Sequence, residues 1–168
     1  SCDNTKTLLE SLLYGDDNSV YTSALRDSTK NVISSIINGM DVNSAIESGL
    51  IESNGRITKD TFKTWANGLA RNIRQSGVED SLSQLFDIQT QSDNMGYKEY
   101  VDEANKLIDG ISSKVPELSS DILKSTTGIG DSIDNLKQKR LDLMNDGLDE
   151  SFLDSLSIED TEIIWDLN

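Results

Sequence analysis

Carboxylates are the side chains of this sequence that could do chemistry, and they stand close together at three places. Asp16-Asp17-Asn18 follows a glycine, and Glu79-Asp80 and Asp102-Glu103 are adjacent acids near expected helix starts. Paired carboxylates can act as general acid and base, and clustered oxygens can hold a hard cation weakly. Acids at helix starts also cap the helix and favour its dipole. We therefore expect helix-start stabilisation at these places, with no catalytic residue, no metal ligand and no cofactor.

The residue types that are missing exclude several catalytic sites. The chain has no histidine and a single cysteine, Cys2. Ser-His-Asp and Cys-His sites, zinc sites with histidine ligands and a disulfide within the chain are therefore excluded. Phosphate-binding glycine loops are absent as well, because Gly128-Ile129-Gly130 lacks the third glycine of a dinucleotide fingerprint. The sequence therefore predicts a protein that is not an enzyme.

Cys2 leaves the location of the protein open. Ser1-Cys2-Asp3 could be the remnant of a lipobox, which would make Cys2 a lipid anchor. A lone free cysteine otherwise fits a reducing compartment. No apolar run is long enough to predict a transmembrane segment. We expect a soluble protein in the cytoplasm or within a protein assembly, with a membrane-anchored lipoprotein as the alternative.

Charge is distributed unevenly along this acidic chain. Fifteen Lys and Arg against 30 Asp and Glu give a net charge of −15. Residues 141–168 hold nine acids and no basic residue. A chain this acidic repels phosphate backbones, so nucleic-acid binding is not expected, whereas a basic protein partner is. The one basic segment has a net charge of +4, because a single acid, Asp60, stands among Arg56, Lys59, Lys63, Arg71 and Arg74.

Apolar spacing predicts an all-α fold of about six to eight helices packed as a compact bundle. The chain has one proline, and its apolar residues recur mostly at steps of 3 and 4. Thr126 to Gly130 is weak in helix formers, so a kink or break is expected there. Asn54-Gly55 between two short apolar pairs predicts one short β-hairpin near residues 50–58. The expected core includes Leu25, Ile33, Ile36, Phe62, Trp65, Leu69, Ile73, Leu82, Phe86, Tyr100, Val101, Ala104, Leu107, Ile108, Ile122, Ile133 and Leu136.

Two segments are expected along the chain. Residues 1–147 are expected to form one helical domain, because each half alone has few apolar stripes to pack. A subdivision at the 89–96 loop is the alternative. Residues 148–168 form an acidic amphipathic C-terminal segment.

Residues 41–62 show two local resemblances. A short helix followed by a hairpin resembles the end of a winged helix-turn-helix domain, which implies a recognition helix. That helix offers Asp41, Asn43, Ser44 and Glu47 and no basic residue, so a helix-hairpin-helix corner without a DNA role is predicted. Residues 50–62 also resemble an EF-hand loop, but Leu50 stands where the first aspartate is required, so no calcium site is predicted.

The acidic tail supplies the candidate partner-binding residues. Acids alternate with large apolar residues in 148–168, and helices could form at 149–156 and 158–167. The segment could lie in a partner's groove, or it could fold back and complete its own core. The predicted partner-binding residues are Phe152, Leu156, Ile163, Ile164, Trp165 and Leu167.

We therefore expect a non-catalytic acidic helical protein that acts through protein–protein contacts, as an adaptor, an assembly factor or a structural subunit. Self-association through the tail or an apolar stripe is one form of this function. The first alternative is an acidic inhibitor or nucleic-acid mimic that occupies a basic groove. The second alternative is a lipoprotein anchored through Cys2.

Overall fold

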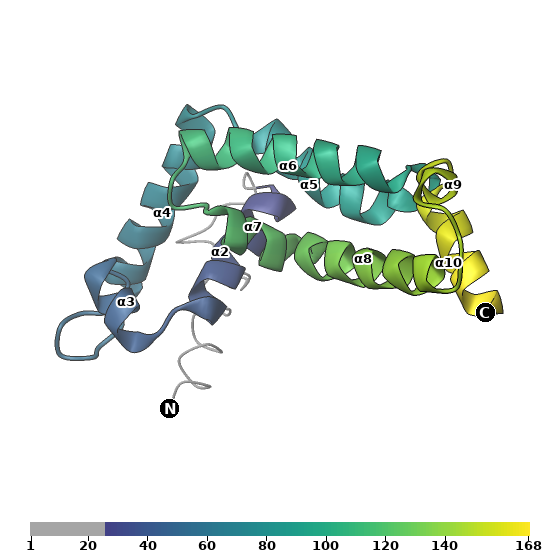
Figure 1. Cartoon of the computed structure of the whole chain (residues 1–168). Helices are drawn as coiled ribbons and strands as arrows, with labels where there is room; N and C mark the ends of the chain where they lie inside the picture. Colours follow the sequence, from purple (N-terminus) through teal and green to yellow (C-terminus); the bar gives the residue numbers. More distant parts are fainter. Residues whose placement is uncertain (1–25) are drawn as a thin grey trace. The chain divides into compact units, whose positions relative to one another are not determined.

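The computed structural model describes residues 26–168, and within this range it contains nine α-helices, one short 3-10 helix and no strand (Figure 1). The all-α prediction is confirmed for these residues. Leu25, Cys2 and the Asp16-Asp17-Asn18 cluster lie outside the described residues. The elements are α2 (Asp27–Gly39), α3 (Val42–Glu47), α4 (Lys59–Gln75), α5 (Glu79–Gln91), η1 (Ser92–Asn94), α6 (Tyr97–Lys114), α7 (Ser120–Thr127), α8 (Ile129–Asn145), α9 (Glu150–Asp154) and α10 (Ile158–Leu167).

The chain divides into two compact units, Ser1–Asp80 and Ser81–Asn168. The first contains α2, α3 and α4, and the second contains α6 to α10 with most of α5. The 89–96 loop, expected as an alternative boundary, lies inside the second unit and includes η1.

The segment from 50 to 58 forms a tight turn, and the predicted β-hairpin is not observed. Gly55 has φ +83°, and its backbone N–H donates to the Glu52 carbonyl over 2.8 Å. The Glu52 N–H donates in turn to the Arg56 carbonyl over 2.8 Å. The Asn-Gly pair thus lies in the turn. The flanking apolar pairs are too short to extend the one bond across it, from Glu52 to Arg56, into a ladder.

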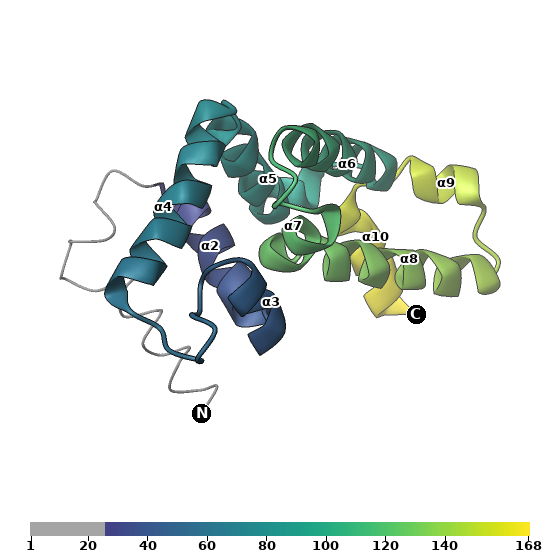
Figure 2. The same cartoon turned by 90° about the vertical axis from the view of Figure 1, so that its left-hand side faces the viewer.

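Helix α4 is the longest element of the first unit among the described residues, and its start and buried face follow from the sequence. Thr58 and Thr61 form a reciprocal capping box at its first turn. Helix α2 packs against α4 (Figure 2). The buried face of α4 consists of Phe62, Ala66, Leu69, Ala70 and Ile73.

In the second unit, Gly128 separates two helices where the sequence predicted a kink or break. Its φ of +77° is the left-handed conformation that favours glycine, and it ends α7 and immediately precedes α8. This break and the two short helices of the tail bring the number of helices in the described residues above the expected six to eight.

Most of the predicted core is buried. Trp65, Phe86, Val101, Leu107 and Ile122 are only partly buried, because each stands beside the fully buried row of its helix. The predicted positions that are buried are Ile33, Ile36, Phe62, Leu69, Ile73, Leu82, Tyr100, Ala104, Ile108, Ile133 and Leu136.

Candidate protein-docking surface

The residues predicted to bind a partner lie in the last two helices and the turn between them. Leu156 and Ile164 are half-buried. The other four side chains are open to solvent, so they do not complete the core of this unit. Their exposed fractions are 47% for Phe152, 50% for Ile163, 38% for Trp165 and 81% for Leu167.

The tail folds onto the second unit through a different set of residues. Leu153 in α9 and Ile158 and Thr161 in α10 are buried. Helix α10 packs against α8 and η1. The two readings of the tail that the sequence left open therefore apply to different side chains: one row is in the core, and another row faces solvent.

A side-chain cap and a backbone hydrogen bond fix the start of α10. The Ser157 hydroxyl accepts a hydrogen bond from the backbone N–H of Asp160 over 3.1 Å, which caps the helix. The N–H of Ile158 donates to the carbonyl of Met95 over 2.8 Å, next to an isolated antiparallel bridge between Gly96 and Ser157. The α9–α10 connection is therefore held against the segment that leads into α6.

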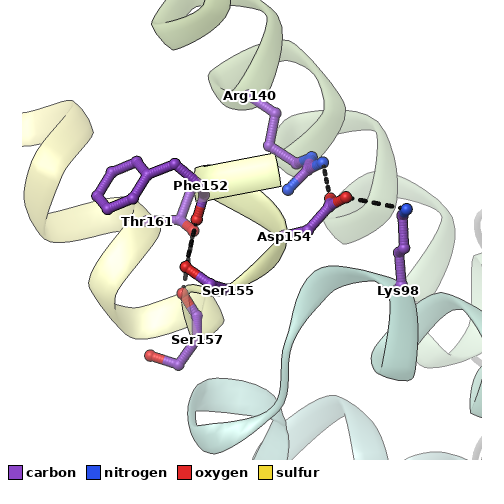
Figure 3. A network of polar contacts seen from close by, with 7 residues as sticks. All are labelled: Lys98, Arg140, Phe152, Asp154, Ser155, Ser157 and Thr161. Atoms are coloured by element: carbon purple, nitrogen blue, oxygen red, sulfur yellow. Dashed lines mark hydrogen bonds and ion pairs between the residues drawn. The ribbon is translucent and has the colours of Figure 1, made fainter. Parts of the chain in front are cut away.

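Asp154 ties α9 to two other helices (Figure 3). Its Oδ1 accepts a hydrogen bond from Arg140 Nη2 of α8 over 2.6 Å, and its Oδ2 lies 2.9 Å from Lys98 Nζ of α6. The hydrogen bond from Lys98 has the larger effect and that from Arg140 the next, and together they hold the pKa of the Asp154 carboxyl below its usual value. Asp154 in turn raises the pKa of Lys98.

Arg140 is a buried cation whose surroundings make it a positioning residue. Its guanidinium carbon lies 4.5 Å from the centroid of the Tyr97 ring, which is the geometry of a cation–π contact. Its Nη1 is buried without a hydrogen-bond partner in the structure. Asp154 is its only ion-pair partner among the described residues, so this pair joins α8 to α9.

Trp165 is held in one orientation although part of its ring is exposed. The indole Nε1 donates to Asp142 Oδ2 of α8 over 3.3 Å. Lys139 Nζ lies 4.8 Å from the centroid of the ring and 3.5 Å from Glu162 Oε1. An aromatic side chain that is already oriented loses little conformational entropy when a partner covers it.

A shallow hollow of about 530 Å³ lies beside Trp165. Three carboxylates and two amides line it together with the indole, and no basic side chain does. This combination favours a cationic group, because carboxylates attract the charge and an indole face attracts a cation. The lining residues are Asp142, Asn145, Asp146, Trp165, Asp166 and Asn168.

The exposed large apolar side chains of the described residues all lie between Leu141 and Leu167. Leu141 and Met144 of α8 join the four exposed tail residues in this group, and the sequence did not single them out. The helical period does separate Met144, which is exposed, from Leu143, which is buried. We call this set the C-terminal surface; it consists of Leu141, Met144, Phe152, Ile163, Trp165 and Leu167.

A second cavity in the same unit is small and polar. Its volume is about 190 Å³, and Tyr100, Gln89 and Ser132 lie along it. The Tyr100 hydroxyl donates to Gln89 Oε1 over 2.7 Å, and Gln89 Nε2 donates to Ser132 Oγ over 2.6 Å. Burial raises the pKa of Tyr100. The chain of bonds links α5, α6 and α8 and contains no nucleophile beside a general base.

Of the two pairs of adjacent acids within the described residues, one binds an arginine and the other makes no ion pair there. Arg26 Nη1 lies 2.7 Å from Asp80 Oδ1, and Arg26 Nε lies 3.5 Å from Glu79 Oε2, so this pair binds an arginine at the start of α5. Asp102 and Glu103 make no ion pair within residues 26–168. In the same range no group of three or more acids and cysteines is placed to hold a metal ion.

The start of the short helix α3 agrees with a capping role for its first acid. Asp41 Oδ1 accepts a hydrogen bond from the backbone N–H of Ser44 over 2.7 Å, and this bond lowers the pKa of Asp41. Asp41 thus caps its own helix.

No protein-family model, curated protein or solved structure matches this chain. None of the helices in the described part of the chain has the length and apolar character needed to cross a bilayer.

Proposed function

We propose that this protein is non-catalytic and acts through protein–protein contacts, as an adaptor, assembly factor or structural subunit, and that the C-terminal surface docks its partner. One observation carries the proposal: within residues 26–168, every exposed large apolar side chain lies in the last 28 residues, between Leu141 and Leu167. Exposed apolar surface of this kind is where soluble proteins bind partners when the side chains form a continuous patch. The absence of histidine from the sequence supports a role without catalysis.

The partner for this surface combines apolar and basic side chains. The apolar residues supply area that gains free energy when it leaves water, about 1.5–3 kcal/mol for each fully buried large side chain. The carboxylates beside Trp165 favour a cation over an anion. Trp165 is the expected centre of the contact, because an oriented tryptophan contributes strongly to binding when it becomes fully buried.

Partner capture with matched variants tests this proposal. The tagged protein is used as bait in an extract of its source cells, the captured protein is identified, and its affinity is measured with both proteins purified. Trp165→Ala should weaken binding by at least tenfold while the helical circular-dichroism spectrum is retained. Gln84→Ala, an exposed position on α5, is the control and should leave affinity unchanged. Equal affinities for both variants would contradict the proposal.

The acidic inhibitor or nucleic-acid mimic is a second candidate, and the unpaired carboxylates favour it. Most acids of residues 141–168 make no ion pair with the described residues. Under this function, affinity should fall steeply with salt, because exposed charges are screened within about 8 Å at physiological ionic strength. Binding that depends strongly on salt but is insensitive to Trp165→Ala supports this alternative.

The location of the protein is a separate proposal. We favour the cytoplasm or a protein assembly over a membrane-anchored lipoprotein, because a lone thiol fits a reducing compartment. The intact mass of the protein isolated from its source distinguishes the two, since acylation of Cys2 would add the mass of the lipid.

A further inference from the structure

We infer that the hollow beside Trp165 receives arginine side chains from helix α4 of a second copy of this chain, so that copies join head to tail. The inference rests on the proposed docking function and names the partner of that surface. It follows from a row of exposed cations in the first unit and from the chemistry of the acidic hollow in the second.

Three cations of α4 lie in one row along the helix. Lys63, Asn67, Arg71 and Arg74 are spaced by 4, 4 and 3 residues, which places them in a row that flanks the buried face of α4. Lys63, Arg71 and Arg74 are exposed. We call this row the basic stripe.

The basic stripe has no counter-charge among residues 26–168. Lys63, Arg71 and Arg74 make no ion pair with any described residue. By contrast, Arg26 and Arg140 each have a carboxylate within 4 Å. Three exposed cations in one row, within a chain of net charge −15, form a surface whose electrostatic complement is acidic.

The hollow offers the chemistry that a guanidinium requires. Asp142, Asp146 and Asp166 supply carboxylate oxygens, which an arginine can bind through two parallel N–H groups. Trp165 is 38% exposed, and Lys139 Nζ already lies 4.8 Å from its ring centroid, so an arginine would stack on the other face of the indole. The aliphatic part of an arginine side chain can also cover apolar neighbours such as Leu167. The stripe has two arginines one helical turn apart, Arg71 and Arg74, to fill this site.

The geometry of such a contact is heterologous, since each copy carries one stripe and one hollow. Heterologous contacts extend into rings or filaments instead of stopping at a symmetric dimer. The net charge of each copy opposes association. Salt at about 0.15 M screens this repulsion beyond about 8 Å, whereas ion pairs in direct contact are closer than that and are screened less. We therefore expect the mean mass to rise with protein concentration at this ionic strength and to fall again at about 1 M salt, where screening reaches about 3 Å.

Charge reversal on each side of the contact tests the inference, with mean mass measured by sedimentation velocity from micromolar to near-millimolar protein. Arg71→Glu with Arg74→Glu reverses the stripe, and Asp146→Arg with Asp166→Arg reverses the hollow while leaving Asp142 to orient Trp165. Each double variant alone should associate at least tenfold more weakly than the natural sequence. An equimolar mixture of the two should recover association, because the reversed stripe then meets the reversed hollow and the natural stripe meets the natural hollow.

The control reverses two exposed lysines outside the contact, by Lys106→Glu with Lys137→Glu, and should associate like the natural sequence. Circular dichroism confirms the fold of each variant, and Arg71→Gln with Arg74→Gln replaces the reversal if the glutamates unfold α4.

A monomer at every concentration would overturn the inference, as would a mixture that fails to recover association. If the natural protein is monomeric yet binds another protein through Trp165, the inference fails and the proposed docking function stands. If Trp165→Ala alters no association of any kind, the docking function fails.

Discussion

Arg140 Nη2 and Asp154 Oδ1 lie 2.6 Å apart, and this contact joins the last cation before the acidic tail to the short helix α9. Lys98 binds the other oxygen of the same carboxylate. These contacts join α9 to α8 and α6, and the exposed Phe152 side chain points away from them (Figure 3). The tail is a folded part of the second unit, and the side chains proposed to dock a partner are presented by that fold.

The Asp154 pair predicts an acid-sensitive contribution to stability. Since the pKa of Asp154 is lowered in the folded state, its contribution is complete above the ordinary aspartate pKa of about 4 and is lost as pH falls through the lower folded value. Asp154→Asn should therefore unfold at lower temperature than the natural sequence near neutral pH, and the difference should shrink in strong acid. Thermal unfolding followed at several pH values measures this.

A matched substitution separates this pair from general loss of charge. Asp109 is exposed on α6 and makes no ion pair with any described residue, so Asp109→Asn should leave the melting temperature nearly unchanged across the same pH range. Similar pH profiles for the two variants would show that the Asp154 contacts do not stabilise α9.

Neighbouring residues of α9 give a second prediction. Leu153 is 0% exposed, whereas the adjacent Phe152 is 47% exposed. Leu153→Ala should lower the free energy of unfolding by about 2–5 kcal/mol, because it leaves a cavity in the core. Phe152→Ala should change it by no more than about 0.5 kcal/mol, the usual range for a surface position. Urea unfolding of both variants decides the point, and equal losses would mean that α9 does not pack as described.

The buried face of α4 gives a third prediction. Leu69 is buried with Phe62 and Ile73, so Leu69→Ala should cost about 2–5 kcal/mol in urea unfolding. Thr64→Ala, at an exposed position of the same helix, is the control and should be nearly neutral. A Leu69→Ala loss near zero would indicate that this face of α4 is not in a core.

The helices were the most predictable part of the fold. The stripes of α4 and α6 repeat at 3 and 4 residues without interruption, so their buried faces could be predicted from the sequence alone. Gly128 likewise stood in a predicted break. The hairpin prediction failed because Asn54-Gly55 specifies a turn, whereas a ladder also requires flanking strands long enough to pair.

The candidate site could be predicted only in part. The exposed residues of the tail were identified by their apolar character among acids, but the partners that orient them were not. Asp142 and Lys139 contact Trp165 across more than 20 residues, and these contacts depend on where α10 packs on α8. Local periodicity carries no information about such long-range pairs. Leu141 and Met144 were missed for a related reason, since their exposure depends on which side of α8 the tail covers.

The contacts of Trp165 give the last prediction, which can be read in a Trp65→Phe background where Trp165 is the only tryptophan. Asp142→Ala removes the acceptor of the indole hydrogen bond and should leave the ring less restrained and more open to water. The expected result is a red-shifted emission, faster quenching by acrylamide and lower fluorescence anisotropy. Stability should change by no more than about 1 kcal/mol, because the contact is exposed. Asp134→Ala, at an exposed position of α8 that does not contact the indole, should leave the emission unchanged. If both variants quench like the parent, the indole is not held by Asp142, and the C-terminal surface would then need another way to keep Trp165 oriented for a partner.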